Sequence, residues 1–590
     1  MFVLAFVSMA AYAQSLTITG KVVDSEGYEL IGSSVTIKGA VGVGTVTDIN
    51  GNYTLKVKDA SKDVLIFSYV GMTSQEVKVN NQSVINVTLK ADAVMLDEVV
   101  AIGYATVKRK DLTGSVASVG GQELSKIPVS DVTQALSGRM AGVMVQQSEG
   151  APGSTVSIRV RGGISITQSN EPLYVIDGFP SEDGMASLDP AEIETIDVLK
   201  DASATAIYGA RGANGVVVIS TKNGSKSHGK ATVTFDSYVG FKTLAKKLDV
   251  LSPYEFVRLD YERTLWRMST GDAGADGMTS WEKRYGKYSD IEANYANRPG
   301  INWQDEALGR TALTQNYRVA VSGKTEKMNY SLAYSFYNEE GAMVYSGTKK
   351  HNISFNMNHE VNKWLTVNSR ISYDQRRVEG MGTSGDSDRF NKMQHILQYR
   401  PTIGIQGTDA ELLAGEDPIL ADDSGNVMQN PLISAAEEIN DREWRTFQAN
   451  GGATIKLLKG LSFRSTVGML YQTRRNDVFY GAESQTAKRS SIKGTITNLE
   501  NNSFQTSNVL TYAWNNKIHD ITAMVGHEFI SKWARSFSAG ATQFPNDEIG
   551  LGDLSLGTPS TPTSSENYDD KLLSFFARVN YSLLDKYLFT

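Results

Sequence analysis

The feature that most constrains the fold is a period-two alternation of apolar and polar residues that recurs from residue 230 onward. In the segment 232–241 one side carries Val233, Phe235, Val239 and Phe241, and the other carries polar residues and one tyrosine. The same alternation returns at 330–336, 365–374, 461–471 and 575–582. Because successive side chains of a β-strand point to opposite faces, the pattern predicts long strands in a large sheet with one apolar and one polar face.

Two architectures use such strands differently. In a soluble sandwich the apolar faces pack against a second sheet, whereas in an outer-membrane barrel they face lipid and the polar faces line the lumen. The connections favour the barrel, because short turns alternate with long polar insertions. The short turns are expected at 323–326, 361–363, 458–460, 515–517 and 584–586, and the long insertions at 244–310, 376–441 and 531–569.

The number of strands indicates an incomplete barrel over 228–590. Counting between the expected turns gives about 11 strands, the last beginning at Tyr587, whereas plugged transporter barrels have about 22. A half barrel would leave unpaired strand edges in lipid. We therefore expect the protein to continue beyond Thr590.

Composition excludes several classes of protein. The chain has 590 residues, a net charge of −7 and no cysteine, which gives no reason to expect nucleic acid and excludes disulfides and a cysteine nucleophile. At the N-terminus, residues 2–11 are apolar and small, and Ala11-Tyr12-Ala13 matches a signal-peptide cleavage site. No Lys or Arg precedes this stretch. We interpret 1–13 as the remnant of a signal peptide whose start lies upstream.

Two further domains are expected before the barrel. Residues 15–90 contain short alternating runs, the turn dipeptide Asn50-Gly51 and a solid apolar run at 64–71, as a small β-sandwich would. Residues 111–225 mix short helices and strands, with Asp189-Pro190 expected to begin a helix. Gly209, Gly212 and Gly215 follow a short helix and precede a strand, so we interpret them as turn positions and not as a phosphate loop.

The connector 91–110 between these two domains holds an acidic start followed by a β-branched run. This segment comprises Asp97, Glu98, Val99, Val100, Ala101, Ile102, Gly103 and Tyr104. We expect it to form an extended, unpaired strand that neither flanking domain needs. Such a strand can be captured at the sheet edge of another protein through main-chain hydrogen bonds.

Several of these stretches resemble one protein family. Residues 158–163, 172–178 and 193–222 resemble the plug domain of TonB-dependent outer-membrane transporters, and 97–104 resembles their TonB box. Residues 106–116 resemble the SusC/RagA branch, and 15–90 resembles the carboxypeptidase-regulatory-like domain that often precedes its plug. The resemblance implies a mainly β fold: an N-terminal β-sandwich, an α/β plug and the first half of a transmembrane β-barrel of about 22 strands.

The resemblance also implies a function and partners. A member of this family imports a bulky nutrient across the outer membrane, with oligosaccharide favoured over peptide as the ligand. The implied partners are TonB with ExbB/ExbD, which would pull on 97–104, a SusD-like surface lipoprotein as a lid, and outer-membrane lipid. Arg159, Arg161 and Arg211 are candidates for ion pairs between plug and barrel wall. Solvent-facing plug arginines remain an equal alternative.

No catalytic, cofactor or metal motif accompanies this pattern. The six histidines lack the spacing of a metal site, and no nucleophile elbow, Walker loop or dinucleotide fingerprint is present. The acidic pairs Asp422-Asp423 and Asp569-Asp570 are expected in solvated loops. We predict a transporter that is not an enzyme. Two alternatives stay open, an outer-membrane adhesin or structural β-protein, and a secreted glycan-active enzyme with paired carboxylates.

Overall fold

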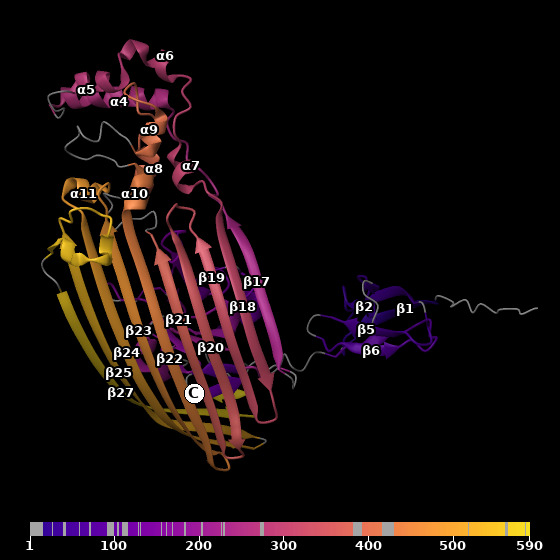
Figure 1. Ribbon diagram of the computed structural model, residues 1–590. Coiled ribbons are helices and arrows are strands. Elements are labelled where there is room, and N and C mark those ends of the chain that lie inside the picture. The colour runs from indigo at the N-terminus through magenta and orange to yellow at the C-terminus, as the bar shows by residue number, and fades with distance from the viewer. Residues whose placement is uncertain are drawn as a thin grey trace, which may run out of the picture. The chain divides into compact units, whose positions relative to one another are not determined.

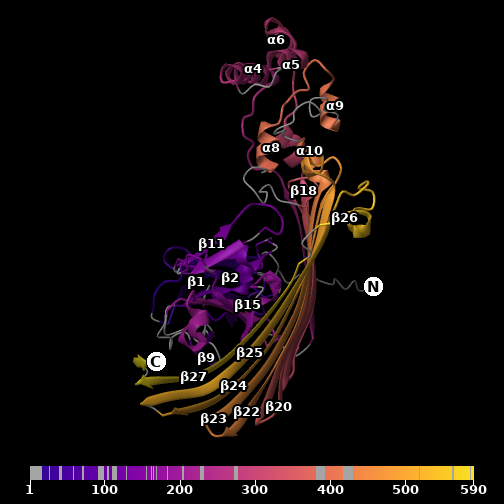
Figure 2. The ribbon, with the colours of Figure 1, turned by 90° about the vertical axis from the view of Figure 1, so that its left-hand side faces the viewer.

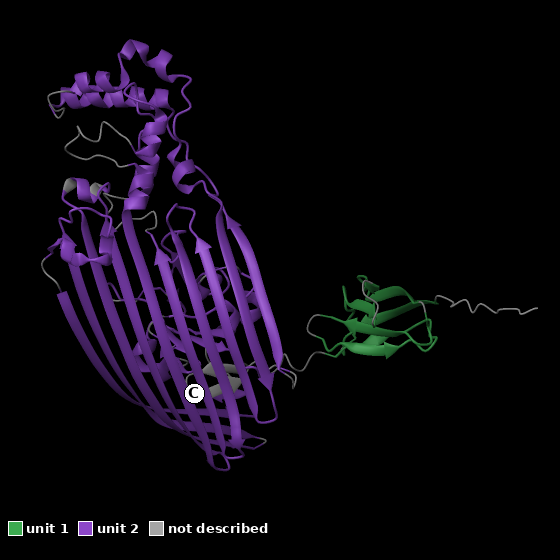
Figure 3. Cartoon of the chain, in the orientation of Figure 1, with its two compact units in different colours: residues 1–100, 106–112 green, residues 101–105, 113–590 purple. Residues whose placement is uncertain are grey.

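The computed structural model forms two compact units, shown in Figure 3, of residues 1–100 with 106–112 and of residues 101–105 with 113–590. It describes residues 16–590 except 26, 39–42, 58, 70–71, 91–98, 103–104, 109–115, 128, 130, 155, 161, 164, 168, 182–183, 202–204, 226, 228–230, 272–276, 381–391, 416–429, 517, 561–563 and 585. The signal segment expected at 1–13 lies outside the described residues.

The first unit contains a β-sandwich, as expected for 15–90. Its strands are β1 (Leu16–Val23), β2 (Ser34–Ile37), β3 (Gly44–Val46), β4 (Asn52–Val57), β5 (Val64–Ser68), β6 (Gln75–Lys78) and β7 (Val87–Thr88). They form two sheets, ordered β4-β1-β7 and β3-β2-β5-β6. Ile18, Val35, Leu55, Leu65 and Phe67 meet in the core between them, because alternate residues of each strand face inward.

The second unit begins with an α/β domain that matches the expected plug. A five-stranded sheet has the order β10-β15-β16-β13-β14, and β11 and β12 form a separate hairpin. The bounds are β10 (Val116–Gly120), α1 (Gly121–Leu124), α2 (Val132–Ala135), β11 (Val143–Gln147), β12 (Val156–Val160), β13 (Leu173–Ile176), β14 (Phe179–Ser181), η3 (Pro190–Glu192), β15 (Ile193–Leu199), η4 (Ala206–Gly212) and β16 (Val216–Thr221). Asp189 caps η3 through a hydrogen bond from the Ala191 amide, with Pro190 at the first position, as the sequence predicted.

The remainder of the second unit is one long, curved antiparallel sheet (Figures 1 and 2). Its main path has eleven strands, β17 to β25 in order and then β27 and β28, and β26 pairs with β25 off this path. The bounds are β17 (Thr232–Lys242), β18 (Ala312–Lys324), β19 (Met328–Glu340), β20 (Gly347–Asn362), β21 (Leu365–Glu379), β22 (Glu438–Leu458), β23 (Leu461–Tyr480), β24 (Lys493–Asn515), β25 (His519–Thr542), β26 (Thr558–Pro559), β27 (Ser564–Leu583) and β28 (Tyr587–Phe589). The strand count and the short turns agree with the expectation from the sequence.

In this sheet the apolar face is exposed and the polar face is buried, which is the reverse of the arrangement in a soluble protein. The predicted apolar faces are exposed, with Phe235 at 64%, Val467 at 48% and Phe575 at 77% of their full surface. The opposite face carries buried polar residues, among them Asn352 and Arg370. Figure 2 shows the plug on the concave, polar side of the sheet. An outward apolar face around a polar interior is the arrangement of a barrel wall in lipid, and no second sheet covers the described apolar strands.

The long connections contain helices that the sequence analysis did not predict. Between β17 and β18 lie α4 (Pro253–Ser269), α5 (Gly277–Tyr285), η5 (Tyr288–Asp290), α6 (Ile291–Tyr295) and α7 (Trp303–Leu308). Between β21 and β22 lie α8 (Lys392–Gln398), α9 (Asp409–Ala414) and α10 (Pro431–Glu437), and α11 (Gln485–Arg489) follows β23. None of the helices within the described ranges has both the length and the apolarity to cross a bilayer.

Two predicted insertions were too long. The stretch 376–441 overlaps β21, which continues to Glu379, and β22, which already begins at Glu438. The stretch 531–569 was expected to be a loop, but β25 continues to Thr542 and β27 already begins at Ser564. Asp569 and Asp570 therefore lie on a strand, in contrast to the prediction. The expected pair Asp422-Asp423 lies outside the described residues.

Candidate functional site

The long curved sheet of β17 to β28 is called the wall below, and the α/β domain beside it the plug. Side chains of the wall donate hydrogen bonds to backbone carbonyls of the plug. On β20 the Lys350 ammonium donates to the carbonyl oxygens of Ala186 and Leu188, each at 2.7 Å. Two residues further along the same face, the Asn352 side-chain amide donates to the Ser187 carbonyl at 2.8 Å. The polar face of β20 thus fixes the plug segment that leads into η3.

Arg370 on β21 is the centre of a buried charge network between wall and plug. Its guanidinium lies 3.4 Å from the Asp177 carboxylate and 3.5 Å from the Glu192 carboxylate, both in the plug. It also donates to the Thr221 hydroxyl at 2.8 Å. Three plug positions distant in sequence, at the ends of β13, η3 and β16, therefore converge on one wall residue. We call Arg370, Asp177, Glu192 and Thr221 the plug latch.

The plug latch is a network whose members depend on one another. The Arg370 and Glu192 side chains are each only 4% exposed. Burial raises the pKa of the Glu192 carboxyl, and the neighbouring Arg370 charge offsets part of that rise. The Ser354 hydroxyl of β20 donates to the same carboxylate at 2.8 Å. Removing one charge of such a group leaves the other buried without compensation.

The three arginines proposed from the sequence lie in different surroundings. Arg211 on η4 lies 3.4 Å from Glu528 of β25, so this plug residue pairs with the wall. Arg159 on β12 is exposed, and no ion pair joins it to another residue that the structure describes. Arg161 lies outside the described residues. The sequence analysis did not identify the plug latch, although the alternation that it noted at 365–374 puts Arg370 on the polar face of that strand, opposite Leu365, Val367 and Ile371.

The candidate TonB box is described only in part. Val99–Ile102 form β8 and Ala105–Lys108 form β9, and the two strands make a two-stranded sheet. The extended conformation agrees with the prediction. The expectation that this strand is unpaired was wrong, because β9 follows closely enough to fold back on it. Asp97, Glu98, Gly103 and Tyr104 lie outside the described residues.

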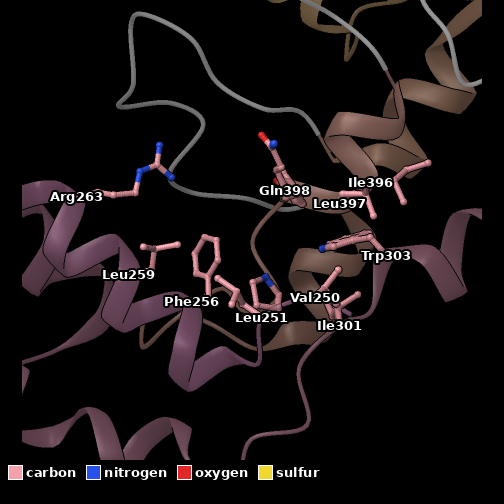
Figure 4. Close-up of a pocket in the computed structure, with 12 residues that line it drawn as sticks. Val250, Leu251, Phe256, Leu259, Arg263, Ile301, Trp303, Ile396, Leu397 and Gln398 are labelled. Carbon is pink, nitrogen blue, oxygen red and sulfur yellow. The ribbon is translucent and has the colours of Figure 1, made fainter. Parts of the chain in front are cut away.

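Helices in the long connections line a half-open pocket of about 440 Å³. Figure 4 shows Phe256 and Leu259 of α4 on one side, with Trp303 and Ile396 on the other. Arg263 adds a charged group to this lining. The pocket can take an apolar group, and it belongs to the connections at the long-loop end of the strands.

A curved sheet with an apolar exterior, a polar interior and a plug fastened to it defines a plugged β-barrel protein of the outer-membrane type. Within the part of the chain that is described, no three His, Asp or Glu residues are grouped to hold a metal ion.

Comparisons with known proteins place the chain in one family of this class. The model described as "TonB-dependent Receptor Plug Domain" matches residues 108–216, and the one described as "CarboxypepD_reg-like domain" matches 18–101. TonB-dependent receptor P3 of Formosa agariphila is 31% identical over 586 residues, which is 98% of this chain and 54% of the relative. TonB-dependent receptor SusC of Bacteroides thetaiotaomicron is 31% identical over 610 residues, covering 99% of this chain and 56% of the relative.

A solved structure agrees with these relatives. The RagAB peptide importer in its open-open state is similar at a TM-score of 0.67 and 26% identity, over 83% of this chain and 55% of that chain. The chain belongs to the SusC/RagA family of TonB-dependent receptors. It spans about half the length of the relatives that it matches.

Proposed function

We propose that this receptor imports a bulky nutrient, an oligosaccharide or a peptide, across the outer membrane by TonB-dependent displacement of its plug. The observation that carries the proposal is the plug latch, which fastens a separate domain to a lipid-facing wall through a few charged contacts. A purely structural β-protein has no need of a removable domain inside its wall. Relatives named TonB-dependent receptors and a similar peptide importer support this function.

The parts suggest an order of events. Ligand binds at the long-loop end, beneath a SusD-like surface lipoprotein that acts as a lid. TonB, energised through ExbB/ExbD, then adds a strand to the segment 97–104 from the periplasmic side. An isolated two-stranded hairpin is only marginally stable in water, so β8 can exchange β9 for a strand of TonB at small cost. Force on the connector then breaks contacts between plug and wall.

The decisive experiment deletes the candidate TonB box, residues 97–104, and leaves the barrel sheet intact. Cells that carry the receptor with residues 97–104 deleted should lose growth on its nutrient, while the protein stays in the outer-membrane fraction. Normal uptake by this deletion strain would rule out the proposed mechanism. A receptor that still binds its ligand at the surface but never depends on TonB would instead fit an adhesin.

Point variants sharpen this test. Proline has no amide hydrogen to donate, and neighbouring strand amides point to opposite edges. One of the variants Val99→Pro and Val100→Pro should therefore block strand addition and abolish uptake. The matched controls Val99→Ala and Val100→Ala keep both amides and should import normally. Equal uptake by all four variants would show that main-chain pairing of β8 is not required.

A further inference from the structure

Three arginines surround Trp444 on neighbouring strands of the wall. In the sheet register Arg376 of β21 is paired with Trp444 of β22, and Trp444 is paired with Arg474 of β23. The guanidinium carbons lie 4.3 Å from the indole centroid for Arg376, 5.2 Å for Arg474 and 6.0 Å for Arg442. We call these four residues the mouth cluster.

The mouth cluster faces the interior of the wall. On β21 Arg376 shares its face with the buried Arg370 and with Val378, whose side chain lies against Gly153 of the plug. On β22 and β23 the buried Thr446 and Gln472 continue the same face. The cluster therefore lies on the side of the sheet that holds the plug, where a passing ligand would travel.

The outward neighbours show at which level of the wall the cluster lies. Arg377, Arg445 and Arg475 each follow a member of the cluster in sequence and point outward, where they pair with acids. The ion pairs are Arg377 with Asp441 at 2.8 Å, Arg445 with Glu443 at 3.0 Å and Arg475 with Asp477 at 2.8 Å. Charged side chains on the outer face, such as this belt of ion pairs, are destabilising within the hydrocarbon core of the bilayer. This part of the sheet therefore lies outside the hydrocarbon core. The mouth cluster lies on the long-loop side, at the level of this belt.

The outward and inward arginines differ in their partners. Neither Arg376 nor Arg474 has a carboxylate within ion-pair distance among the residues described, and the buried Nε of Arg376 has no hydrogen-bond acceptor. Beside them, the side-chain oxygens of Asn440 and Asn476 are buried acceptors without a donor. The cluster therefore combines guanidinium groups with buried amide oxygens that have no hydrogen-bond donor. Stacking on the indole holds the guanidinium planes and lowers the entropy lost when they bind.

We propose that the mouth cluster binds the carboxylate or sulfate of an acidic oligosaccharide on its way to the plug. The guanidinium fork matches both oxyanions in a bidentate manner, and sugar hydroxyls supply the donors that the Asn440 and Asn476 oxygens lack. This proposal rests on the proposed import function and names the class of its substrate. Acidic sugars, with an oxyanion next to several hydroxyls, fit the mixed donor and acceptor surface better than an acidic peptide.

The test compares adjacent arginines that point in opposite directions. The receptor expressed from its full gene is purified in detergent and titrated calorimetrically with trigalacturonate and with its methyl ester, and with a carrageenan disaccharide and its desulfated form. At least one charged sugar should bind more tightly than its neutral counterpart. The double variant R376Q/R474Q should weaken that binding by about tenfold or more. The control R377Q/R475Q removes the same charge from the outer face and should bind like the wild type.

Each other outcome contradicts the proposal in a recognisable way. Equal weakening in both double variants would assign the effect to net charge. A preference for triglutamate over the charged sugars would identify an acidic peptide as the ligand. If R376Q/R474Q cells keep full uptake of their nutrient and the purified receptor binds no charged sugar, the mouth cluster is not a ligand site. Import itself would then stand, because the deletion of residues 97–104 tests it separately.

Discussion

At the scale of single residues, Arg370 should matter more than any surface arginine. Replacing it with Met removes the cation from two plug carboxylates, one of them nearly fully buried. We expect Arg370→Met to destabilise the docked plug by about 3 kcal/mol. Arg475→Met, which removes an arginine from an exposed pair, should cost less than about 1 kcal/mol. Chemical unfolding monitored by proteolysis of the plug measures both, and equal effects would refute the latch.

Glu192 should give the docked plug a dependence on pH. Burial raises the pKa of its carboxyl above the ordinary 4.5, so at pH values between the unfolded and the folded pKa the folded state keeps a proton that the unfolded state has lost. This contribution to stability is fully present below about 4.5 and is lost as the pH rises through the raised pKa. In Glu192→Gln the thermal midpoint should vary less across this window than in the wild type. Glu192→Asp, which keeps a titrating group, should retain the dependence, and identical curves for all three proteins would exclude this role.

At the scale of elements, the outward face of β23 should be sensitive to depth. Val467 lies on the apolar part of that face, whereas Thr473 lies on the same face beside the charged belt. We expect Val467→Arg to cost about 2–4 kcal/mol on insertion into vesicles, and Thr473→Arg about 0–1 kcal/mol. Folding yield into lipid vesicles, measured by the heat-dependent shift in gel mobility, reports the difference. Equal yields would mean that Val467 does not face hydrocarbon.

Most strands could be predicted from the sequence alone, whereas some strand ends and the helices of the long connections were missed. Period-two alternation predicted the strands and their faces correctly, because lipid on one side and water on the other impose opposite polarity. The ends of β25 and β27 were missed because beyond the lipid core the outward residues become polar and the alternation fades. The helix α4 had a readable signal, since Ser252 and Glu255 form a capping box around Pro253.

The candidate site was less predictable than the strands. Alternation placed Arg370 on the polar face, but it could not tell that Asp177, Glu192 and Thr221 meet it, because that convergence depends on how the plug is folded and docked. Arg159 and Arg211 of the plug were equal candidates for an ion pair with the wall, but among the described residues only Arg211 has such a partner. Partner choice is a property of tertiary structure, not of local pattern.

At the scale of the whole molecule, the proposed import mechanism requires the plug and wall to separate, and the absence of cysteine from these 590 residues allows a direct test by crosslinking. A Cβ placed on Gly153 of the plug would lie 3.3 Å from the Cβ of Val378 on β21. Disulfides join Cβ atoms about 3.5–4.5 Å apart, so the double variant Gly153→Cys/Val378→Cys should crosslink after a small shift. Oxidised cells should lose nutrient uptake, and a reductant should restore it.

The single-cysteine variants distinguish the effect of the disulfide between plug and wall from destabilisation caused by either substitution alone. Gly153 has a φ of +69°, a conformation that a cysteine adopts at a cost of about 1–2 kcal/mol, and its Cβ would overlap the Cγ2 methyl of Val378, so Gly153→Cys alone reports both the backbone strain and this overlap. It should lower stability slightly and leave uptake insensitive to oxidant, as should Val378→Cys alone. If the crosslinked receptor imports at the full rate, the segment around Gly153 stays on the wall during transport. Displacement would then be confined to other parts of the plug, and ligand would pass beside Gly153 without breaking its contact with β21.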